Sequence, residues 1–213
     1  AAKVAEGLGI AVTKPEYPLN HGVPADGDQA AHEPVKGKNS LNKSAALSME
    51  NTIKDSIRTR QIAVLAANGV DENSLKTMKS ALEKAGATVK IIAPKLGTIK
   101  SLKGADIPVD QSFLVAASVL FDAVYIPSGG KSAQALIAEP DAVHFVNEAF
   151  RHCKAIAATG DGAELLKESY AGKALGSNKE KNQALGVLSD PSPEDFIKAI
   201  AGHRFWDREL ARK

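Results

Sequence analysis

Short apolar runs alternate with amphipathic stretches along the last two-thirds of the chain. The apolar runs, each bounded by turn residues, lie at 62–67, 88–93, 123–126, 154–158 and 184–188. Runs of this kind are typical of strands that are buried on both faces of a sheet. In the intervening stretches apolar residues recur at helical spacing, over 71–85, 131–138, 140–152, 161–167 and 192–202. The regular succession of strand and helix predicts a parallel sheet with helices packed on both of its faces.

Turn and capping residues mark the boundaries of these elements. Asp71 can cap the helix that follows the first strand, and Gly86 ends that helix. Residues 97–100 and 107–109 carry a shorter pattern that predicts a small hairpin. We therefore expect residues 61–213 to form a three-layer, flavodoxin-like α/β domain with a mainly parallel sheet.

The first ten residues predict a piece of helix. Val4, Leu8 and Ile10 are spaced so that they share one helix face. Because the chain begins within this pattern, it looks like a segment of a larger protein. The apolar face would need a partner surface to cover it.

Residues 12–60 have the character of a linker. Four prolines, several glycines and scattered polar residues leave little periodicity in this stretch. Passive loops of such length are uncommon, so we expect an extended arm that packs along a protein surface. Met49, Ile53 and Ile57 recur every four residues and predict a short helical turn near its end.

Composition and charge exclude several classes of protein. Of the 213 residues, 44% are hydrophobic and 24% are charged, which is ordinary for a globular chain and unlike collagen or a disordered protein. Lys and Arg total 27 against 25 Asp and Glu, and no basic run is interleaved with aromatic residues, so we expect no nucleic-acid partner. No apolar stretch approaches the roughly 20 residues that span a bilayer, so we expect no membrane partner. The single cysteine, Cys153, excludes an internal disulfide and a thiolate metal site.

The loops that follow the strands are where an open α/β sheet binds ligands. One of them ends in Gly130-Lys131-Ser132, but a phosphate-binding P-loop would require glycine where Tyr125 stands. We interpret this loop as a turn that leaves the sheet. The loop at 68–71 lacks the hydroxyl-rich composition that would bind a flavin phosphate, so we do not expect FMN.

A second glycine-containing loop reads Thr-Gly-Asp-Gly from Thr159 to Gly162. A dinucleotide-binding fingerprint requires a third small residue where Leu165 stands, with an acidic residue about 20 positions later. Two glycines of three leave a nucleotide-binding module at Gly160–Gly162 as one alternative.

Histidine and cysteine give no clear catalytic pattern. The five histidines share no metal-type spacing and are His21, His32, His144, His152 and His203. The first two fall in the arm, and we expect the other three to lie on solvated helix surfaces. Cys153 stands at a helix end just before a strand, and we predict a buried, unreactive thiol, because neighbours such as His152 do not face each other on a helix.

The C-terminal segment combines an aromatic pair with a charged stretch. We expect Phe205 and Trp206 to act as a plug that docks the last helix onto the domain. The residues from Asp207 onward predict a solvated, charged face.

Several separated segments, in the same order, resemble the C-terminal domain of the large-subunit catalases. They are Arg60-Gln-Ile-Ala-Val-Leu65, Gly86-Ala-Thr-Val-Lys-Ile-Ile-Ala-Pro-Lys95, Ser118-Val-Leu-Phe-Asp-Ala-Val124, Glu139-Pro140 and Ala149-Phe-Arg-His-Cys-Lys154. The resemblance covers 61–213 and extends into the arm. There the opening residues resemble the end of the catalase helical region, followed by the family's long wrapping linker.

That domain is similar in fold to the glutamine amidotransferase-like superfamily, which includes intracellular proteases and glyoxalase- or deglycase-type proteins. Those enzymes hold a cysteine on a strained strand-to-helix elbow, often followed by His, with an acidic residue after the first strand. The resemblance puts the nucleophile position on Gly160, the next position on Asp161, and the acidic position on Asp71, with Glu72 one step away. Glycine adopts such a backbone without strain but has no atom that can attack a substrate. Asp161 would need a strongly raised pKa to replace the imidazole at neutral pH, so we expect a degenerate elbow and no catalytic residue.

The resemblance therefore implies a non-catalytic domain of a catalase. The parent would decompose hydrogen peroxide at a haem held in its N-terminal barrel and helical regions by a distal His with an Asn and a proximal Tyr. Tyr17, Tyr125 and Tyr170 match none of that context, and we expect no cofactor or metal in this chain. In the parent, the domain would pack on the tetramer, partly cover the route to the haem and raise stability.

The resemblance also implies holdase-like chaperone behaviour. A separated domain would expose the apolar surface that it uses against its parent, and that surface could bind unfolded clients or make the isolated chain a homodimer rather than a monomer. The alternative from another class is a hydrolase or glyoxalase-type enzyme that uses non-standard residues such as Cys153. The family has cytoplasmic and secreted members, and the sequon Asn42-Lys43-Ser44 is compatible with secretion.

Overall fold

The computed structural model describes residues 2–9, 44–174 and 179–210. The chain divides into two compact units, residues 1–44 and 45–213. In the first unit the structure has helix α1 (Ala2–Leu8), as the sequence predicts, with Val4 and Leu8 exposed. Most of the predicted arm lies outside the described residues, and so do Ile10, His21, His32, Tyr17 and the sequon residue Asn42.

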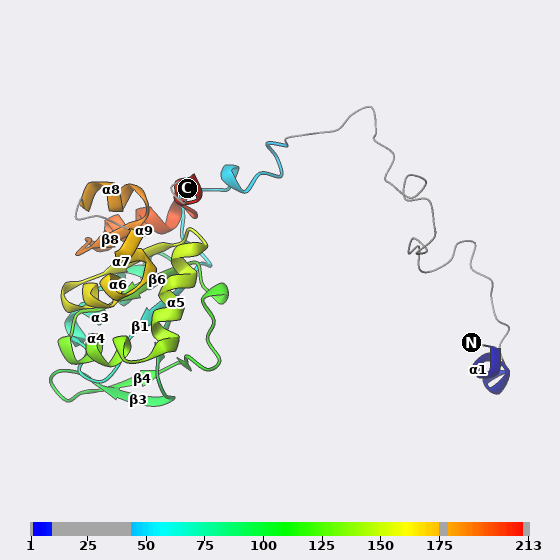
Figure 1. Ribbon diagram of the computed structural model, residues 1–213, viewed down its shortest axis with the longest axis horizontal. Helices are drawn as coiled ribbons and strands as arrows, with labels where there is room; N and C mark the ends of the chain where they lie inside the picture. The colour runs from blue at the N-terminus through cyan, green and yellow to red at the C-terminus, as the bar shows by residue number, and fades with distance from the viewer. Residues whose placement is uncertain (1, 10–43, 175–178, 211–213) are drawn as a thin grey trace. The chain divides into compact units, whose positions relative to one another are not determined.

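The second unit is built on a six-stranded sheet in the order β5-β2-β1-β6-β7-β8 (Figure 1). The strands are β1 (Gln61–Leu65), β2 (Thr88–Ala93), β5 (Gln111–Ser112), β6 (Ala123–Ile126), β7 (Ala155–Ala158) and β8 (Val187–Ser189). Every neighbouring pair is parallel. The predicted hairpin is present as the antiparallel pair β3 (Gly97–Lys100) and β4 (Asp106–Val109).

Helices follow the strands as the alternation predicts. They are α3 (Glu72–Lys84), α4 (Gly130–Ile137), α5 (Pro140–Arg151), α6 (Ala163–Glu168), α7 (Tyr170–Ala174), α8 (Lys179–Ala184), α9 (Pro193–Ala201) and α10 (Asp207–Leu210). Single 3-10 turns are η1 (Met49–Asn51), η2 (Ser118–Leu120) and η3 (Gly160–Gly162). Among the described helices, none has the length and apolar character that a bilayer crossing requires.

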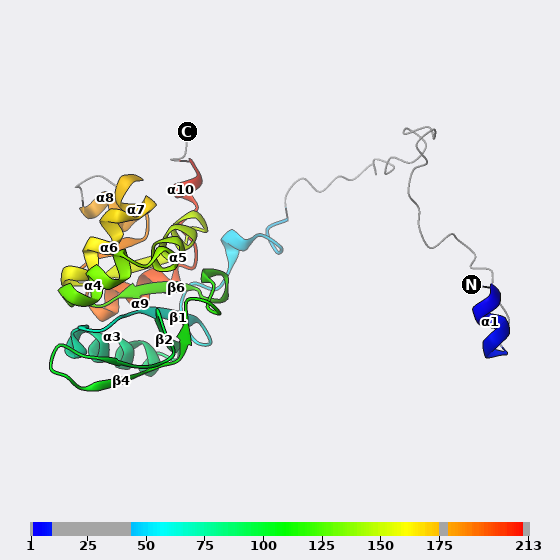
Figure 2. The same cartoon turned by 60° about the horizontal axis from the view of Figure 1, so that its bottom comes forward.

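Alternate residues of each strand bury two separate cores. On β1, Ile62 and Val64 face one core with α3 and α9, while Ala63 and Leu65 face the other with α4, α5 and α6. Figure 2 shows the sheet between these layers, with α3 below it and α5 and α6 above it. This arrangement confirms the three-layer α/β fold, and it explains why the strands read as continuous apolar runs.

The start of β8, one of the two edge strands of the sheet, differs from the prediction. The run at 184–188 was expected to be a strand, but helix α8 reaches Ala184 and Leu185 still donates to the carbonyl of Lys181. Gly186, at φ +74, then redirects the chain, so that the strand begins only at Val187. At the opposite edge β5 has just two residues, too few for a hydrophobic pattern to indicate.

Three side chains outside the sheet lie differently from the prediction. His203 is buried directly after α9, at φ +71, and is not on a helix surface. Of the aromatic plug, Phe205 packs against the core, whereas Trp206 is 37% exposed. The predicted helical turn is limited to η1. Ile53 and Ile57 lie beyond it and do not share a face, since Ile53 is exposed while Ile57 is fully buried.

The charged C-terminal stretch is not entirely a solvated face. Arg208 is only 3% exposed. Its guanidinium donates to the carbonyl oxygens of Leu185 (2.5 Å), Phe150 (3.0 Å) and Lys154 (2.8 Å). The same group lies 4.7 Å from the ring centre of Phe150, so helix α10 is fastened to the domain by one buried cation.

Candidate functional site

The loop after β7 has the backbone of a strand-to-helix elbow. Gly160 has φ +50 directly after Thr159, and the chain then turns through η3 into α6. The N–H of Gly160 donates to Oδ1 of Asp190 at 2.6 Å. The amide that could have met a phosphate or an oxyanion is therefore already held by a carboxylate.

The space beside Gly160 is occupied. A Cβ atom placed on this glycine would lie 2.4 Å from Oγ and 3.0 Å from Cβ of Ser128. Ser128 belongs to the loop after β6, which thus fills the position of an elbow side chain. Gly162 is also closely packed, since its Cβ would lie 2.6 Å from the backbone carbonyl oxygens of Ile126 and Pro127. The two glycines of the suspected nucleotide fingerprint therefore allow close packing of two loops.

A cluster of three hydroxyl groups lies beside this elbow. Ser74 Oγ is 2.8 Å from Tyr125 Oη and 2.7 Å from Thr159 Oγ1, and the last two oxygens are 2.9 Å apart. The N–H of Ser128 donates to Ser74 Oγ at 3.2 Å. Burial raises the pKa of Tyr125, the hydrogen bonds from Ser74 and Thr159 oppose that rise, and the charge of Asp71 adds to it. The cluster therefore stays protonated at neutral pH and joins α3, β6 and β7.

The two acidic residues of the predicted elbow have different surroundings. Asp71 is the N-cap of α3, and its Oδ1 accepts the N–H of Asn73 at 3.1 Å. Asp161 is exposed, and its Oδ2 lies 3.7 Å from the place that a Cβ on Gly130 would occupy. Asp71 and Gly160 both adjoin Ser128. The structure thus brings the three predicted positions around the loop that follows β6.

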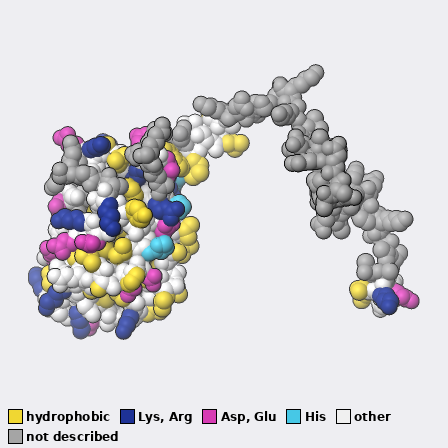
Figure 3. Space-filling model, viewed as in Figure 1, with side chains coloured by type: hydrophobic (Ala, Val, Ile, Leu, Met, Phe, Trp, Pro, Cys, Tyr) yellow, Lys and Arg dark blue, Asp and Glu magenta, His cyan; other side chains and the backbone are white. Residues whose placement is uncertain are grey.

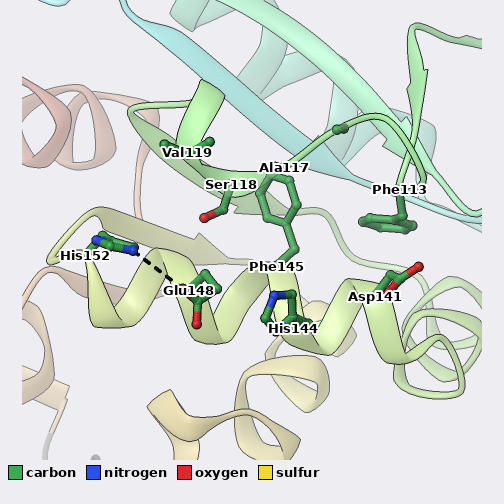
Figure 4. Close-up of a pocket in the computed structure, with 10 residues that line it drawn as sticks. Phe113, Ala117, Ser118, Val119, Asp141, His144, Phe145, Glu148 and His152 are labelled. Atoms are coloured by element: carbon green, nitrogen blue, oxygen red, sulfur yellow. Dashed lines mark ion pairs between the residues drawn. The ribbon is translucent and has the colours of Figure 1, made fainter.

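A pocket of about 280 Å³ lies on another part of the domain, between α5 and the β5–β6 connection. Figure 4 shows Phe145 rising from α5 toward this connection, with Phe113 to one side. Asp141, His144, Glu148 and His152 follow one stripe of α5 along its rim. The pocket is lined by the two phenylalanines and these four rim residues, together with Ala116, Ala117, Ser118 and Val119.

Among the ionisable groups of this rim, Glu148 pairs with its neighbours at the end of α5. Glu148 accepts from Arg151 at 2.8 Å and lies 3.5 Å from Nε2 of His152. Burial alone would raise the pKa of Glu148, but the hydrogen bond and charge of Arg151, with the charges of His144 and His152, lower it. Within the described ranges, no three His, Cys, Asp or Glu side chains gather closely enough to hold a metal ion.

An adjoining pocket of about 320 Å³ lies at the C-terminal end of α5. Lys154 lines it and is nearly fully buried, with its Nζ donating to the carbonyl oxygen of Ser118. Burial, with a smaller contribution from the charge of Arg204, lowers the pKa of Lys154 to about 8, and the charges of Asp122 and Glu148 oppose this shift. The hydrogen bond of this buried lysine to Ser118 connects η2 to the start of β7.

Lys154 predicts an unusual dependence of stability on pH. The native state releases this proton near pH 8, whereas the unfolded chain keeps it to about 10.5, so stability rises with pH between the two values. The free energy of unfolding should therefore rise by about 2 kcal/mol, relative to Lys154→Met, between pH 7.5 and 9.5. Urea unfolding at each pH measures this difference. Lys103→Met, at an exposed lysine, should show no such slope, and a flat difference for Lys154→Met would contradict the assignment.

Cys153 is held in a structural position. It is buried and follows α5 at φ +57, in the left-handed conformation that glycine usually supplies at helix ends. Its N–H donates to the carbonyl of Phe150, and the next N–H, of Lys154, donates to that of Ala149. This Schellman-type ending fits the buried thiol that the sequence predicts, with His152 exposed beside it.

Three features near the two pockets were not predicted from the sequence. Lys154 and Arg208 are cations whose burial depends on carbonyl groups far along the chain, and no local pattern marks them. The exposed apolar residues of the β5–β6 connection lie in an aperiodic segment. A signal was available for them, because the run Phe113-Leu-Val-Ala-Ala-Ser-Val-Leu-Phe121 is too apolar for an ordinary loop.

Comparison with known proteins places this architecture in a family. The family described as "C-terminal domain found in long catalases" matches residues 58–209. The chain is 37% identical over 175 residues to Catalase HPII of Mycobacterium avium, covering 78% of this chain and 25% of that protein. It is 30% identical over 213 residues to Catalase HPII of Pseudomonas aeruginosa, covering 100% of this chain and 26% of that protein. The chain thus spans about a quarter of the length of the curated relatives it matches.

Solved structures agree on the fold. A two-domain protein from Anabaena variabilis that contains DJ-1/ThiJ/PfpI-like and ferritin-like domains matches with a TM-score of 0.56 and 20% identity, over 71% of this chain and 48% of that one. Oxidized DJ-1 of Toxoplasma gondii matches with a TM-score of 0.53 and 14% identity, over 73% of this chain and 100% of that one. At these identities the likeness concerns the fold alone. By the match over residues 58–209 and the catalase relatives, the chain belongs to the family of C-terminal domains found in long catalases.

Proposed function

We propose that this chain is a non-catalytic domain that docks onto the rest of a large-subunit catalase, stabilises the parent tetramer and, when separated, acts as a holdase-like chaperone. The parent would decompose hydrogen peroxide at its haem. We assign no haem ligand to this chain, since the described Tyr125 is buried in the hydroxyl cluster and Tyr170 lies on a helix surface.

The environment of Gly160 carries the non-catalytic part of the proposal. The residue has the positive φ of a nucleophile elbow but no side chain, and Ser128 fills the space where one would project. Asp190 already accepts the local N–H, and its charge opposes the binding of a phosphate or an oxyanion. These contacts weigh against both a hydrolase and a nucleotide-binding module at this loop.

The alternative enzyme that uses Cys153 gains no support from the geometry. Its sulfur is buried and lies 3.9 Å from the carbonyl oxygen of Arg151 and from Oε1 of Glu209, both of which oppose formation of a thiolate. An activated cysteine needs an adjacent base or a positive field directed at the sulfur. Arg204 and Arg208 lie near enough for their charges to act on Cys153, but their guanidinium groups donate to backbone carbonyl oxygens. We therefore favour the docking domain.

An exposed apolar surface supports docking. Leu114, Val115, Val119 and Leu120 all project from the β5–β6 connection, and Leu114 and Val119 are 85% and 74% exposed. In Figure 3 hydrophobic side chains gather along the edge from which this connection projects in Figure 1. We call these four residues the connection patch. Clusters of this kind on soluble domains usually mark interaction surfaces.

We assign the connection patch to the remainder of the same chain. The relatives are about four times longer than this chain, and the matched family describes a C-terminal domain, so a large folded body precedes it in those proteins. A covalently joined body meets the patch at high effective concentration. The connection patch therefore need not be a large apolar surface to keep the domain docked.

Exchange of Leu114 and Val119 for serine tests this assignment. In the full-length catalase we expect the midpoint of thermal inactivation to fall, because docked apolar contacts are lost. In the 213-residue chain the free energy of unfolding should change by less than about 0.5 kcal/mol, because both side chains are already exposed. Thermal inactivation and urea unfolding give the two readouts.

The matched control exchanges Leu96 and Leu102, which are also exposed but lie on either side of strand β3. This pair should leave the full-length enzyme unchanged. Equal effects of the two pairs, or no effect of either, would rule out the connection patch as the docking surface.

The same variants test the holdase role by light scattering from a heat-aggregating client enzyme, where only the connection-patch pair should weaken suppression. A chain that starts at Ala45 separates this contribution from that of residues 1–44.

A further inference from the structure

The pocket at the end of α5 has an unbalanced set of charges. Its ionisable lining, apart from His152 and the buried thiol of Cys153, is Arg151, Lys154 and Arg204 against Glu209. Arg151 is paired outside the pocket with Glu148 at 2.8 Å. The remaining two cations have no carboxylate of the described residues within ion-pair distance.

Arg204 is the cation of this lining that a bound anion would stabilise most. Its Nη1 donates to the carbonyl oxygen of His203 at 3.1 Å, which leaves the other guanidinium donors available. Burial lowers the pKa of Arg204, Asp122 opposes this shift and Arg60 adds to it. Asp122 pairs with Arg60 at 3.3 Å, so it acts on Arg204 only through its charge, without an ion pair.

Lys154 adds a second positive charge to the same wall. Its Nζ makes a single hydrogen bond, to the carbonyl oxygen of Ser118, and the ammonium can donate three. Arg204 and Lys154 both line this pocket and are both desolvated by burial, so an anion there would interact with the charge of each.

The pocket also has an apolar part. Trp206, Val119 and Met49 are exposed and line it, together with His152 and Cys153. A volume of about 320 Å³ is at the lower end of the range for small-molecule sites. An aromatic or aliphatic body of modest size could lie on the indole while its charged end meets the cations.

We propose that this pocket binds a small organic carboxylate, with the carboxylate on Arg204 and Lys154 and its apolar body against Trp206. The site is separate from the degenerate elbow, and nothing in it requires the elbow to be active. It adjoins the connection patch, because Val119 belongs to both, but the binding of a carboxylate does not require docking.

Trp206 makes the proposal directly testable. It is the only tryptophan of the chain, so its fluorescence reports this pocket alone. Titration of the 213-residue chain with phenylacetate should change the emission with a saturable dependence, and calorimetry should give the same dissociation constant. The uncharged analogue phenylacetamide should bind at least about tenfold more weakly. Sulfate, as a probe of anion binding without an apolar body, should also bind more weakly.

Two opposite substitutions separate charge recognition from non-specific contact. Arg204→Gln should weaken phenylacetate binding about tenfold, whereas Glu209→Gln should strengthen it, because it removes the lining carboxylate. Lys103→Gln, at an exposed lysine outside the pocket, should leave it unchanged. If Arg204→Gln fails to fold, Glu209→Gln with the phenylacetamide comparison still decides. Equal binding of acid and amide, tighter binding of sulfate, or no saturable binding of phenylacetate would overturn the proposal.

Discussion

Replacement of Arg208 by methionine is expected to lower the free energy of unfolding of the chain by about 3 kcal/mol. Methionine keeps an apolar stem but removes three hydrogen bonds from a charged donor to the carbonyls of Phe150, Lys154 and Leu185. These carbonyls come from three separate parts of the domain, so their common donor holds all of them together. Urea unfolding followed by circular dichroism measures the loss.

Arg151→Met provides the control, since this arginine is exposed and makes one surface ion pair with Glu148. Its substitution should cost less than about 1 kcal/mol. Arg208→Lys should recover only part of the lost stability, because an ammonium cannot reach three carbonyls in the planar geometry of a guanidinium. A cost of Arg208→Met no larger than that of Arg151→Met would show that α10 does not depend on this cation.

Replacement of Gly129 by alanine should destabilise the domain by at least about 3 kcal/mol. The residue has φ +132, and a Cβ there would lie 2.4 Å from the carbonyl oxygen of Gly69, 2.8 Å from Cα of Val70 and 2.9 Å from the backbone nitrogen of Asp71. All three are backbone atoms, so no side-chain rotation can relieve the clash. The loops after β1 and β6 would have to separate. Thermal unfolding of the purified variant measures the effect.

Gly104→Ala distinguishes steric conflict from backbone strain. Gly104 has φ +84, also unfavourable for alanine, but a Cβ there meets nothing within 4 Å. Its substitution should therefore cost only about 1 kcal/mol. If both variants lose the same stability, the close approach of the two loops contributes nothing beyond the conformation of the glycine.

The elements that could be predicted from the sequence are those whose signal is local. Parallel strands buried on both faces, such as 62–65 and 123–126, read as apolar runs whatever the rest of the chain does. Asp71 could be identified as a helix cap because a cap bonds to residues next to it in sequence. The elbow position of Gly160 came from resemblance, and its positive φ is what such a position requires.

The parts that could not be predicted depend on distant contacts. Arg208 lies in a stretch that reads as a solvated face, and only carbonyls 23 to 58 positions away in the sequence explain its burial. His203 likewise looks like an exposed helix residue until the end of α9 turns it inward. Long polar side chains carry no pattern that tells a buried cation from an exposed one.

The two outer strands of the sheet limit how this domain can self-associate. β5 has two residues and β8 has three, so each edge offers very few backbone groups to an incoming extended chain. Short edges are a common protection against edge-to-edge strand addition and amyloid growth. A domain with an exposed apolar surface but such short edge strands offers side chains for contact while remaining a poor template for fibrils.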